Sequence, residues 1–144
     1  MNIEIVTIGD TPVPQYATEL SAGLDLINAG DEVDIPPGCL VRLPTGIKMR
    51  IPPGYTGLLT PRSGKSFKSV GFSVANSPGV IDADYSDELG ILACNYGNEP
   101  VHIGKGERIS QLLIVPVMHF MIKHVEELSP VKSSRVGGFG STGQ

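Results

Sequence analysis

The stretch Gly79-Val80-Ile81-Asp82-Ala83-Asp84-Tyr85-Ser86-Asp87-Glu88 joins a β-branched pair to four acids and one aromatic residue. The β-branched pair favours a pleated strand, and the small polar residues after the tyrosine permit a turn. We therefore predict an acidic β-hairpin whose return strand is Glu88–Asn95. Alternate side chains of a strand share a face, which would place Asp82 and Asp84 together. Such a pair of like charges indicates either a solvated hairpin or a site beside a cation or charged ligand.

Short strand-like stretches separated by turns make up the rest of the chain. The 18 glycines and 12 prolines interrupt it too often for long helices. The one expected helical turn starts after Ser63 and runs to about Val70. Many short strands with regular turns predict an all-β sandwich or barrel. Besides Glu88–Asn95, we expect strands over residues 2–8, 33–35, 40–51, 55–60, 72–75, 101–103, 109–117 and 120–125.

Length and charge narrow the possible functions. A chain of 144 residues forms one compact domain and can bury a core without disulfides. Its net charge of -4 argues against the broad basic surface that polymeric nucleic acid requires. Basic residues gather instead at Arg62, Lys65 and Lys68, with Arg108 and Arg135 elsewhere. This local cluster suits a small phosphate ligand, although charge runs are more often solvated loops.

The cysteines and histidines do not indicate a disulfide framework or a zinc site. Cys39 and Cys94 are far apart, and each is expected to be a small buried apolar residue. His102, His119 and His124 are isolated as well, so we assign none of them as a ligand or base.

Membrane and export signals are not evident. The longest apolar run, Leu112–Val117, is too short to span a bilayer. The first eight residues alternate between apolar and polar instead of forming a secretory leader. We therefore expect a soluble protein, cytoplasmic or otherwise intracellular, without a membrane partner.

The last ten residues, 135–144, differ from the rest in composition. Their four glycines leave little to bury, so we expect the segment to be flexible when alone. A frayed tail is the usual form of such a terminus. Phe139 favours a lid instead, because its ring can stack on a base while backbone amides and hydroxyls hold phosphates. We therefore divide the chain into a β domain, 1–134, and a C-terminal arm, 135–144.

Five segments together carry a family resemblance: Ser21–Leu26, Arg62–Lys65, the stretch 79–88, Gly106–Ile109 and Arg135–Gly143. In this order and spacing they resemble the five motifs of the trimeric dUTP pyrophosphatase (dUTPase) family. The resemblance implies a jelly-roll-like β-barrel and Mg²⁺-dependent hydrolysis of dUTP to dUMP and pyrophosphate, by attack of water on the α-phosphorus. That reaction limits uracil incorporation into DNA and supplies dUMP for dTMP synthesis. It also implies a homotrimer in which the arm closes over a neighbour's site.

The resemblance assigns roles to individual residues. Asp82 becomes the general base that orients and deprotonates water, and Asp25 holds Mg²⁺ through waters. Tyr85 packs against the deoxyribose and rejects a 2′-hydroxyl by steric exclusion, while Asn76 lies beside the uracil. The other substrate-binding positions are Gly79, Val80 and Ile81 at the uracil edge, Phe139 stacked on the uracil, and Arg62, Ser63, Gly64, Gln111, Arg135, Gly140, Ser141 and Thr142 at the phosphates.

Each assignment has a structural alternative. Asp82 can be a hairpin-capping acid, Tyr85 a cross-strand aromatic, and Asn76 a turn residue before Ser77-Pro78-Gly79. Arg108 matches the fourth motif, but it can equally form a structural ion pair with Glu107 or a neighbour.

Three positions depart from the family pattern. Ser86-Asp87 replaces the usual Arg-Gly, which removes a structural arginine. Lys65 stands where the family usually has an apolar residue, and it would add a phosphate contact or be solvated. One residue is missing between Arg135 and Phe139, which puts the contact of Arg135 with the γ-phosphate in doubt.

Two other functions compete with this interpretation. The dCTP deaminases share the fold and a similar Arg-Ser motif, but their catalytic glutamate has no counterpart in Leu89–Cys94. A non-catalytic nucleotide-binding protein would keep the pocket without the chemistry, and the intact Asp25, Asp82 and Tyr85 argue against it.

Overall fold

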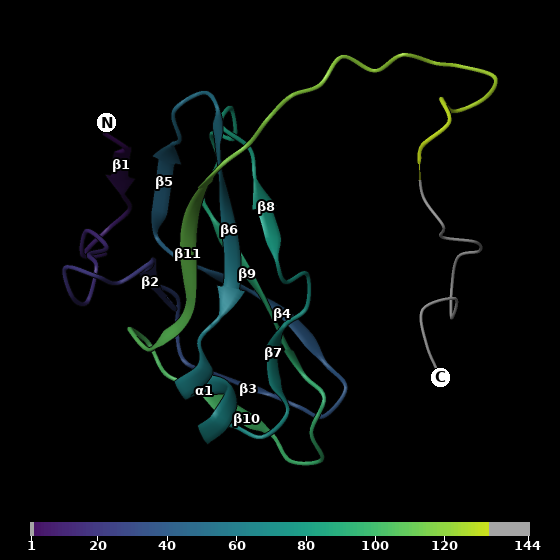
Figure 1. The fold of residues 1–144 in the computed structure, drawn as a ribbon. Coiled ribbons are helices and arrows are strands. Elements are labelled where there is room, and N and C mark those ends of the chain that lie inside the picture. Colours follow the sequence, from purple (N-terminus) through teal and green to yellow (C-terminus); the bar gives the residue numbers. More distant parts are fainter. Residues whose placement is uncertain (1, 133–144) are drawn as a thin grey trace.

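The computed structural model describes residues 2–132, and nearly all of their regular structure is β-strand (Figure 1). The single helix of these residues, α1 (Ser63–Lys68), lies where the sequence predicts one helical turn. The strands, in chain order, are β1 (Glu4–Thr7), β2 (Gly23–Ile27), β3 (Val33–Ile35), β4 (Leu40–Pro44), β5 (Ile47–Arg50), β6 (Tyr55–Pro61), β7 (Phe72–Val74), β8 (Gly79–Ile81), β9 (Gly90–Asn95), β10 (Val101–Ile103) and β11 (Arg108–Pro116). The all-β class is confirmed. Within the described part of the chain, no helix has the length and apolarity needed to cross a bilayer.

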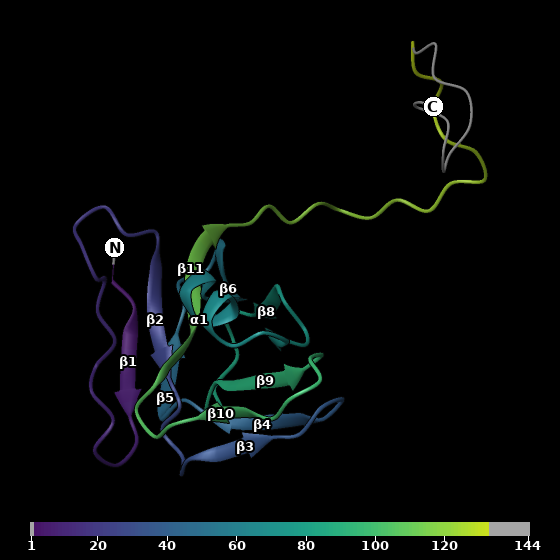
Figure 2. The ribbon, with the colours of Figure 1, turned by 90° about the horizontal axis from the view of Figure 1, so that it is seen from below.

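Antiparallel pairing arranges the strands in four open sheets. The largest has the order β2-β11-β6-β8, the next has the order β4-β9-β7, and β1-β5 and β10-β3 are two-stranded. In Figure 2, strands β3, β4, β9 and β10 lie together on one side, and β2, β11, β6 and β8 lie on the other. Strand β11 pairs along both of its edges, so its register places Gln111 opposite Asp25 on β2 and Thr60 on β6.

Alternating apolar residues of these sheets form one core. Burial of each Val, Leu, Ile, Met or Phe side chain in it contributes about 1.5–3 kcal/mol to stability. The buried members are Leu24, Leu26, Ile35, Leu43, Ile47, Met49, Ile51, Leu59, Phe72, Val74, Leu89, Ile91, Ala93, Val101, Ile103, Ile109 and Leu112. Among residues 2–132, the buried core therefore lies within residues 24–112, before the chain leaves β11.

The predicted acidic hairpin is wrong. Strand β8 pairs with β6, whereas the supposed return strand, β9, pairs with β4 and β7 in another sheet. Strand β8 ends at Ile81, and a turn follows in which the Tyr85 N–H donates to the Asp82 carbonyl at 3.1 Å. Asp82 and Asp84 thus lie on a turn and not on one face of a strand. The physical reason is that β9 is buried along most of its length, so it needs a neighbouring strand on each edge.

The predicted strand over residues 40–51 is two strands, β4 and β5, which belong to different sheets. They separate at Thr45-Gly46, where Gly46 has a φ of 68°. The Thr45 hydroxyl donates to the Leu89 carbonyl at 2.8 Å and anchors the corner. The glycine permits a left-handed backbone that a side chain would disfavour.

The predicted strand over residues 120–125 is absent, and the chain beyond β11 runs away from the sheets as an extended segment (Figures 1 and 2). Met121 is 99% exposed and Ile122 is 93% exposed. The alternating sequence suits a strand, but no other described strand pairs with this segment. The burial expected for the two cysteines holds for Cys94 and is wrong for Cys39, which is exposed after the Pro37-Gly38 turn.

Candidate active site

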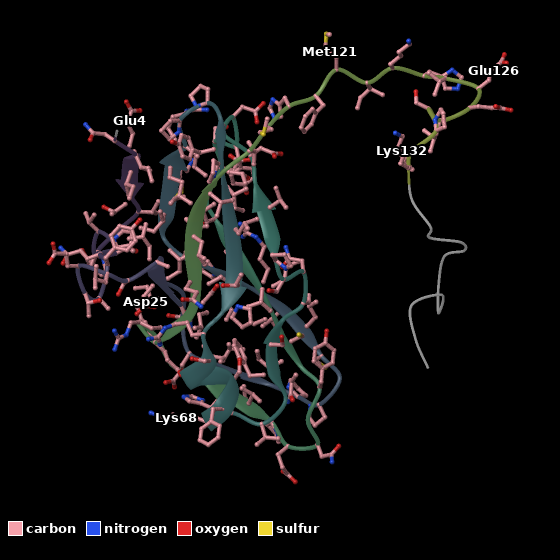
Figure 3. All side chains as sticks on the ribbon, in the orientation of Figure 1. Glu4, Asp25, Lys68, Met121, Glu126 and Lys132 are labelled. Atoms are coloured by element: carbon pink, nitrogen blue, oxygen red, sulfur yellow. The ribbon has the colours of Figure 1, made fainter. Side chains whose placement is uncertain are left out.

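A carboxylate and two guanidinium groups meet where β2, β6 and β11 adjoin. The carboxylate belongs to Asp25, which is labelled in Figure 3. Asp25 Oδ1 lies 2.7 Å from Arg62 Nε, and Asp25 Oδ2 lies 3.3 Å from Arg108 Nη1. Arg62 also donates from Nη1 to the Arg108 carbonyl at 3.1 Å. Arg62 follows the end of β6 and Arg108 opens β11, so antiparallel pairing brings both to Asp25. Arg108 therefore forms its ion pair with Asp25 and not with Glu107, whose carboxylate contacts Lys65.

Asp25 and Arg62 line a pocket of about 260 Å³, which we call the Asp25 pocket. Its other predicted residues are Ser63, Gly64 and Gln111. Gln111 Nε2 donates to the Pro61 carbonyl at 3.1 Å, and its Oε1 faces Gly23, where a β-carbon would come within 2.9 Å. The pocket brings together a guanidinium fork, a hydroxyl, an amide and open backbone. Guanidinium groups with neighbouring polar donors are well suited to phosphate oxygens.

The Asp25 pocket offers few protein ligands for Mg²⁺, so most ligands of a bound ion would be waters and substrate phosphates. Among the described residues that line it, Asp25 is the only carboxylate, and residues 2–132 contain no cluster of three or more metal-ligating side chains. Mg²⁺ keeps several waters and commonly uses one or two carboxylates together with substrate phosphates. A single half-buried carboxylate, Asp25, would fit such an ion if the ion were held mainly through waters.

Asp82 lies on an exposed turn that other elements hold in place. The Thr56 hydroxyl of β6 donates to the Ile81 carbonyl at 2.7 Å, and Arg50 Nη1 donates to the Ala83 carbonyl at 3.4 Å. The turn borders a second pocket of about 710 Å³, the Asp82 pocket, which Tyr55, Val80 and His119 also line. Sequence reasoning missed Thr56 and Arg50, because their contacts are to backbone carbonyls remote in sequence.

Tyr85 closes this turn, whereas Asn76 lies at the other end of β8. The Tyr85 hydroxyl donates to the Glu88 carbonyl at 3.1 Å, and the side chain is partly exposed. Asn76 lies in the turn after β7, and a β-carbon on Gly79 would lie 3.0 Å from its Nδ2. The close approach of Asn76 to Gly79 is compatible with both of its proposed roles, the turn residue and the uracil contact.

The two pockets lie at opposite ends of β6 and share no lining residue. Ile81 stands opposite Gly57, which places Asp82 beside the start of β6, while Arg62 follows its end. Six residues of strand separate these points by about 20 Å. Within one chain, the structure therefore brings together Asp25, Arg62 and Gln111 but keeps Asp82 away from them.

Lys65 does not take either role expected for it. Its side chain is buried, and its Nζ lies 2.7 Å from Glu107 Oε1. It is neither solvated nor a lining residue of the Asp25 pocket. The resembled family usually has an apolar residue at position 65, and this was the indication in the sequence that the position is buried. The predicted residues Arg135, Phe139, Gly140, Ser141 and Thr142 lie outside the described part of the chain.

Comparison with known proteins identifies the family. The dUTPase family model matches residues 10–143. The deoxyuridine 5'-triphosphate nucleotidohydrolase of Methylocella silvestris is 44% identical over 137 residues, covering 93% of this chain and 84% of that protein. Its counterpart in Syntrophotalea carbinolica is 45% identical over 132 residues, covering 91% of this chain and 88% of that protein.

Solved structures agree with this family. The dUTPase of Staphylococcus bacteriophage 80alpha, bound to dUpNHpp, has a TM-score of 0.87 at 32% identity and covers 99% of both chains. A mutant dUTPase of the S. aureus phage phi11, described for its coordination of a structural Mg(II) ion, has a TM-score of 0.81 at 26% identity. That alignment covers 90% of this chain and 100% of the phage protein. This chain belongs to the dUTPase family, the hydrolases that convert dUTP to dUMP and pyrophosphate.

Proposed function

We propose that this dUTPase binds the triphosphate of dUTP in the Asp25 pocket and receives its general base, Asp82, from a second copy of the chain. The observation that carries the proposal is the pairing of β6 with β8, which places Asp82 and Arg62 at opposite ends of one strand. A base must lie within hydrogen-bond reach of the water that it activates. A site built from one chain would leave the two groups about 20 Å apart, so the site requires a neighbour.

A homotrimer with three shared sites satisfies this geometry. Closed cyclic symmetry repeats one contact around an axis, so every copy can contribute its Asp82 turn to one neighbour and receive a turn from the other. The exposed apolar side chains after β11, such as Met121 and Ile122, support association of copies.

Each group has a chemical task in this proposal. The Arg62 guanidinium, the Ser63 hydroxyl and the Gly64 backbone hold phosphate oxygens. Mg²⁺ held by Asp25 through waters would neutralise part of their charge. Asp82 takes a proton from the water that attacks the α-phosphorus. Tyr85 packs against the deoxyribose and leaves no room for a 2′-hydroxyl.

The uracil and the terminal phosphates are assigned to the remaining predicted residues. Asn76 and the backbone of Gly79–Ile81 contact the uracil edge. From the arm, Phe139 stacks on the uracil, while Arg135, Gly140, Ser141 and Thr142 close over the phosphates.

Product analysis tests the reaction against its rivals. We expect Mg²⁺-dependent release of pyrophosphate and dUMP from dUTP, and much less release from dCTP, dTTP or UTP. Ammonia release from dCTP would indicate a deaminase, although β9 supplies no acid to act as its base. Binding of dUTP without turnover would indicate the non-catalytic alternative.

A further inference from the structure

Lys65 is the only charged residue among residues 2–132 with so little exposed surface, at 7%. Its Nζ contacts Glu107 Oε1 at 2.7 Å and donates to the His102 carbonyl at 3.0 Å. The same nitrogen lies 5.5 Å from the centre of the Phe72 ring. A buried ammonium is costly unless it is paired and hydrogen-bonded, and Lys65 meets both conditions.

Glu107 uses both of its carboxylate oxygens. Oε1 contacts Lys65, and Oε2 accepts a hydrogen bond from the Gly104 N–H at 2.9 Å. Partial burial alone would raise the pKa of Glu107, but the Lys65 ammonium and the Gly104 N–H together hold it below its usual value. The carboxylate is therefore ionised at neutral pH, and the contact with Lys65 is a charged pair.

The Lys65–Glu107 pair connects the two segments that carry Arg62 and Arg108, the arginines in contact with Asp25. Lys65 belongs to α1, and its backbone N–H donates to the Arg62 carbonyl at 3.1 Å. Glu107 directly precedes Arg108 and accepts from the Asn28 N–H at 2.9 Å through its own carbonyl. Each arginine is thus close to one member of the pair along the chain, and both contact Asp25.

We infer that the Lys65–Glu107 pair positions Arg62 and Arg108 for the triphosphate, in addition to stabilising the fold. This inference rests on the proposed phosphate role of the Asp25 pocket. The pair itself touches neither substrate nor reacting atoms. It acts by holding α1 against the turn before β11, and small misplacements of binding groups are costly to an enzyme.

The test compares Lys65→Met and Glu107→Gln with a matched control, Lys105→Met, which changes an exposed lysine of the same turn. Met fills the buried space without the charge, and Gln keeps an acceptor for the Gly104 N–H. We expect KM for dUTP, and Kd for Mg²⁺-pyrophosphate by calorimetry, to rise about tenfold in both variants and to stay unchanged in the control.

Three further readouts separate positioning from simple stabilisation. Partial unfolding lowers the concentration of active enzyme, and thus kcat, without raising KM. Lys65→Arg should recover part of the lost affinity, because it keeps a charged donor for Glu107. In Lys65→Met/Glu107→Gln, KM should rise no further than in either single variant, since the two residues act as one unit.

A KM within about twofold of wild type in folded Glu107→Gln would overturn the inference, even if Lys65→Met fails to fold. An unchanged Kd for Mg²⁺-pyrophosphate in Glu107→Gln would also overturn it. Wild-type enzyme that releases no pyrophosphate from dUTP would instead refute the proposed function. The pyrophosphate affinities would still decide the positioning role in that case.

Discussion

Asp82 stands on an exposed turn, and within the described chain no salt bridge engages its carboxylate. An unpaired carboxylate at the rim of a pocket is free to accept a proton from water. We expect Asp82→Asn to lower kcat by about 10²- to 10⁴-fold, the usual contribution of a general base. Binding of dUpNHpp should change little, because the amide has nearly the same shape. Steady-state kinetics and calorimetry measure the two effects, and undiminished turnover would remove Asp82 from the role of base.

Glu107 is the second residue whose charge has a measurable consequence. Its pKa is lowered in the folded protein, so the unfolded chain binds more protons in the acid range. The resulting stability is present above the ordinary glutamate pKa of 4.5 and is lost as pH falls through the lower folded value. We expect the melting temperature of wild type to fall more steeply below about pH 5 than that of Glu107→Gln. Parallel melting curves for the two proteins across that range would contradict this assignment.

Strand β6 carries two threonines whose hydroxyl groups can be compared. The Thr56 hydroxyl bonds the Ile81 carbonyl at 2.7 Å, whereas the Thr60 hydroxyl is buried without a hydrogen-bond partner among the described residues. Thr56→Val should cost about 1–3 kcal/mol, because a partly buried carbonyl loses its donor. It should also lower kcat, because that bond holds the turn carrying Asp82.

Thr60→Val is the matched control on the same strand. Valine suits a strand, and no hydrogen bond is lost, so stability should change by less than about 0.5 kcal/mol or improve. Urea unfolding measures both variants. Equal losses in the two would show that strand packing, and not the bond to Ile81, sets the effect.

Removal of the C-terminal arm, residues 135–144, is expected to lower activity much more than stability. Among residues 2–132, the buried core lies within residues 24–112, so removal of residues 135–144 leaves these core residues in place. We expect the truncated chain to melt within about 2 °C of the full chain and to lose at least about tenfold in kcat/KM through the missing lid. Thermal unfolding and steady-state kinetics on the same preparation measure the two effects. Comparable losses of stability and of kcat/KM would exclude a lid.

At the scale of the whole molecule, shared sites predict complementation between inactive chains. Asp82→Asn lacks the base and Arg62→Gln lacks a phosphate ligand, but a mixed trimer pairs an intact turn with an intact pocket at some sites. Random assembly from equal amounts should restore about a quarter of wild-type activity. The control mixes Asp82→Asn with the Asp82→Asn/Arg62→Gln double variant, which supplies no intact turn. Recovery no greater than in this control would place both groups in one chain's site.

Local features of the sequence predicted much of this protein. Turn residues, β-branched runs and short alternations located most strands and the single helix, because these preferences act within a few residues. The motif residues of the Asp25 pocket were also recognisable, since Asp25, Arg62 and Gln111 keep the order and spacing of the family. What they do in catalysis stays a prediction that the variants above test.

Only the tertiary structure decided which strands are neighbours and which charges are buried. Strand β8 pairs with β6 and not with β9 because strand edges far apart in the sequence compete for hydrogen-bonding partners. The two-residue alternation of side chains along a strand does not indicate which strand will pair with it. For the same reason, the sequence could not show that Asp82 and Arg62 stand at opposite ends of β6. The sequence predicted that Lys65 contacts phosphate or is solvated. In the structure its counter-charge is Glu107, 42 residues away. Strand propensity is local, whereas pairing, burial and site assembly are set by contacts between segments far apart in the chain.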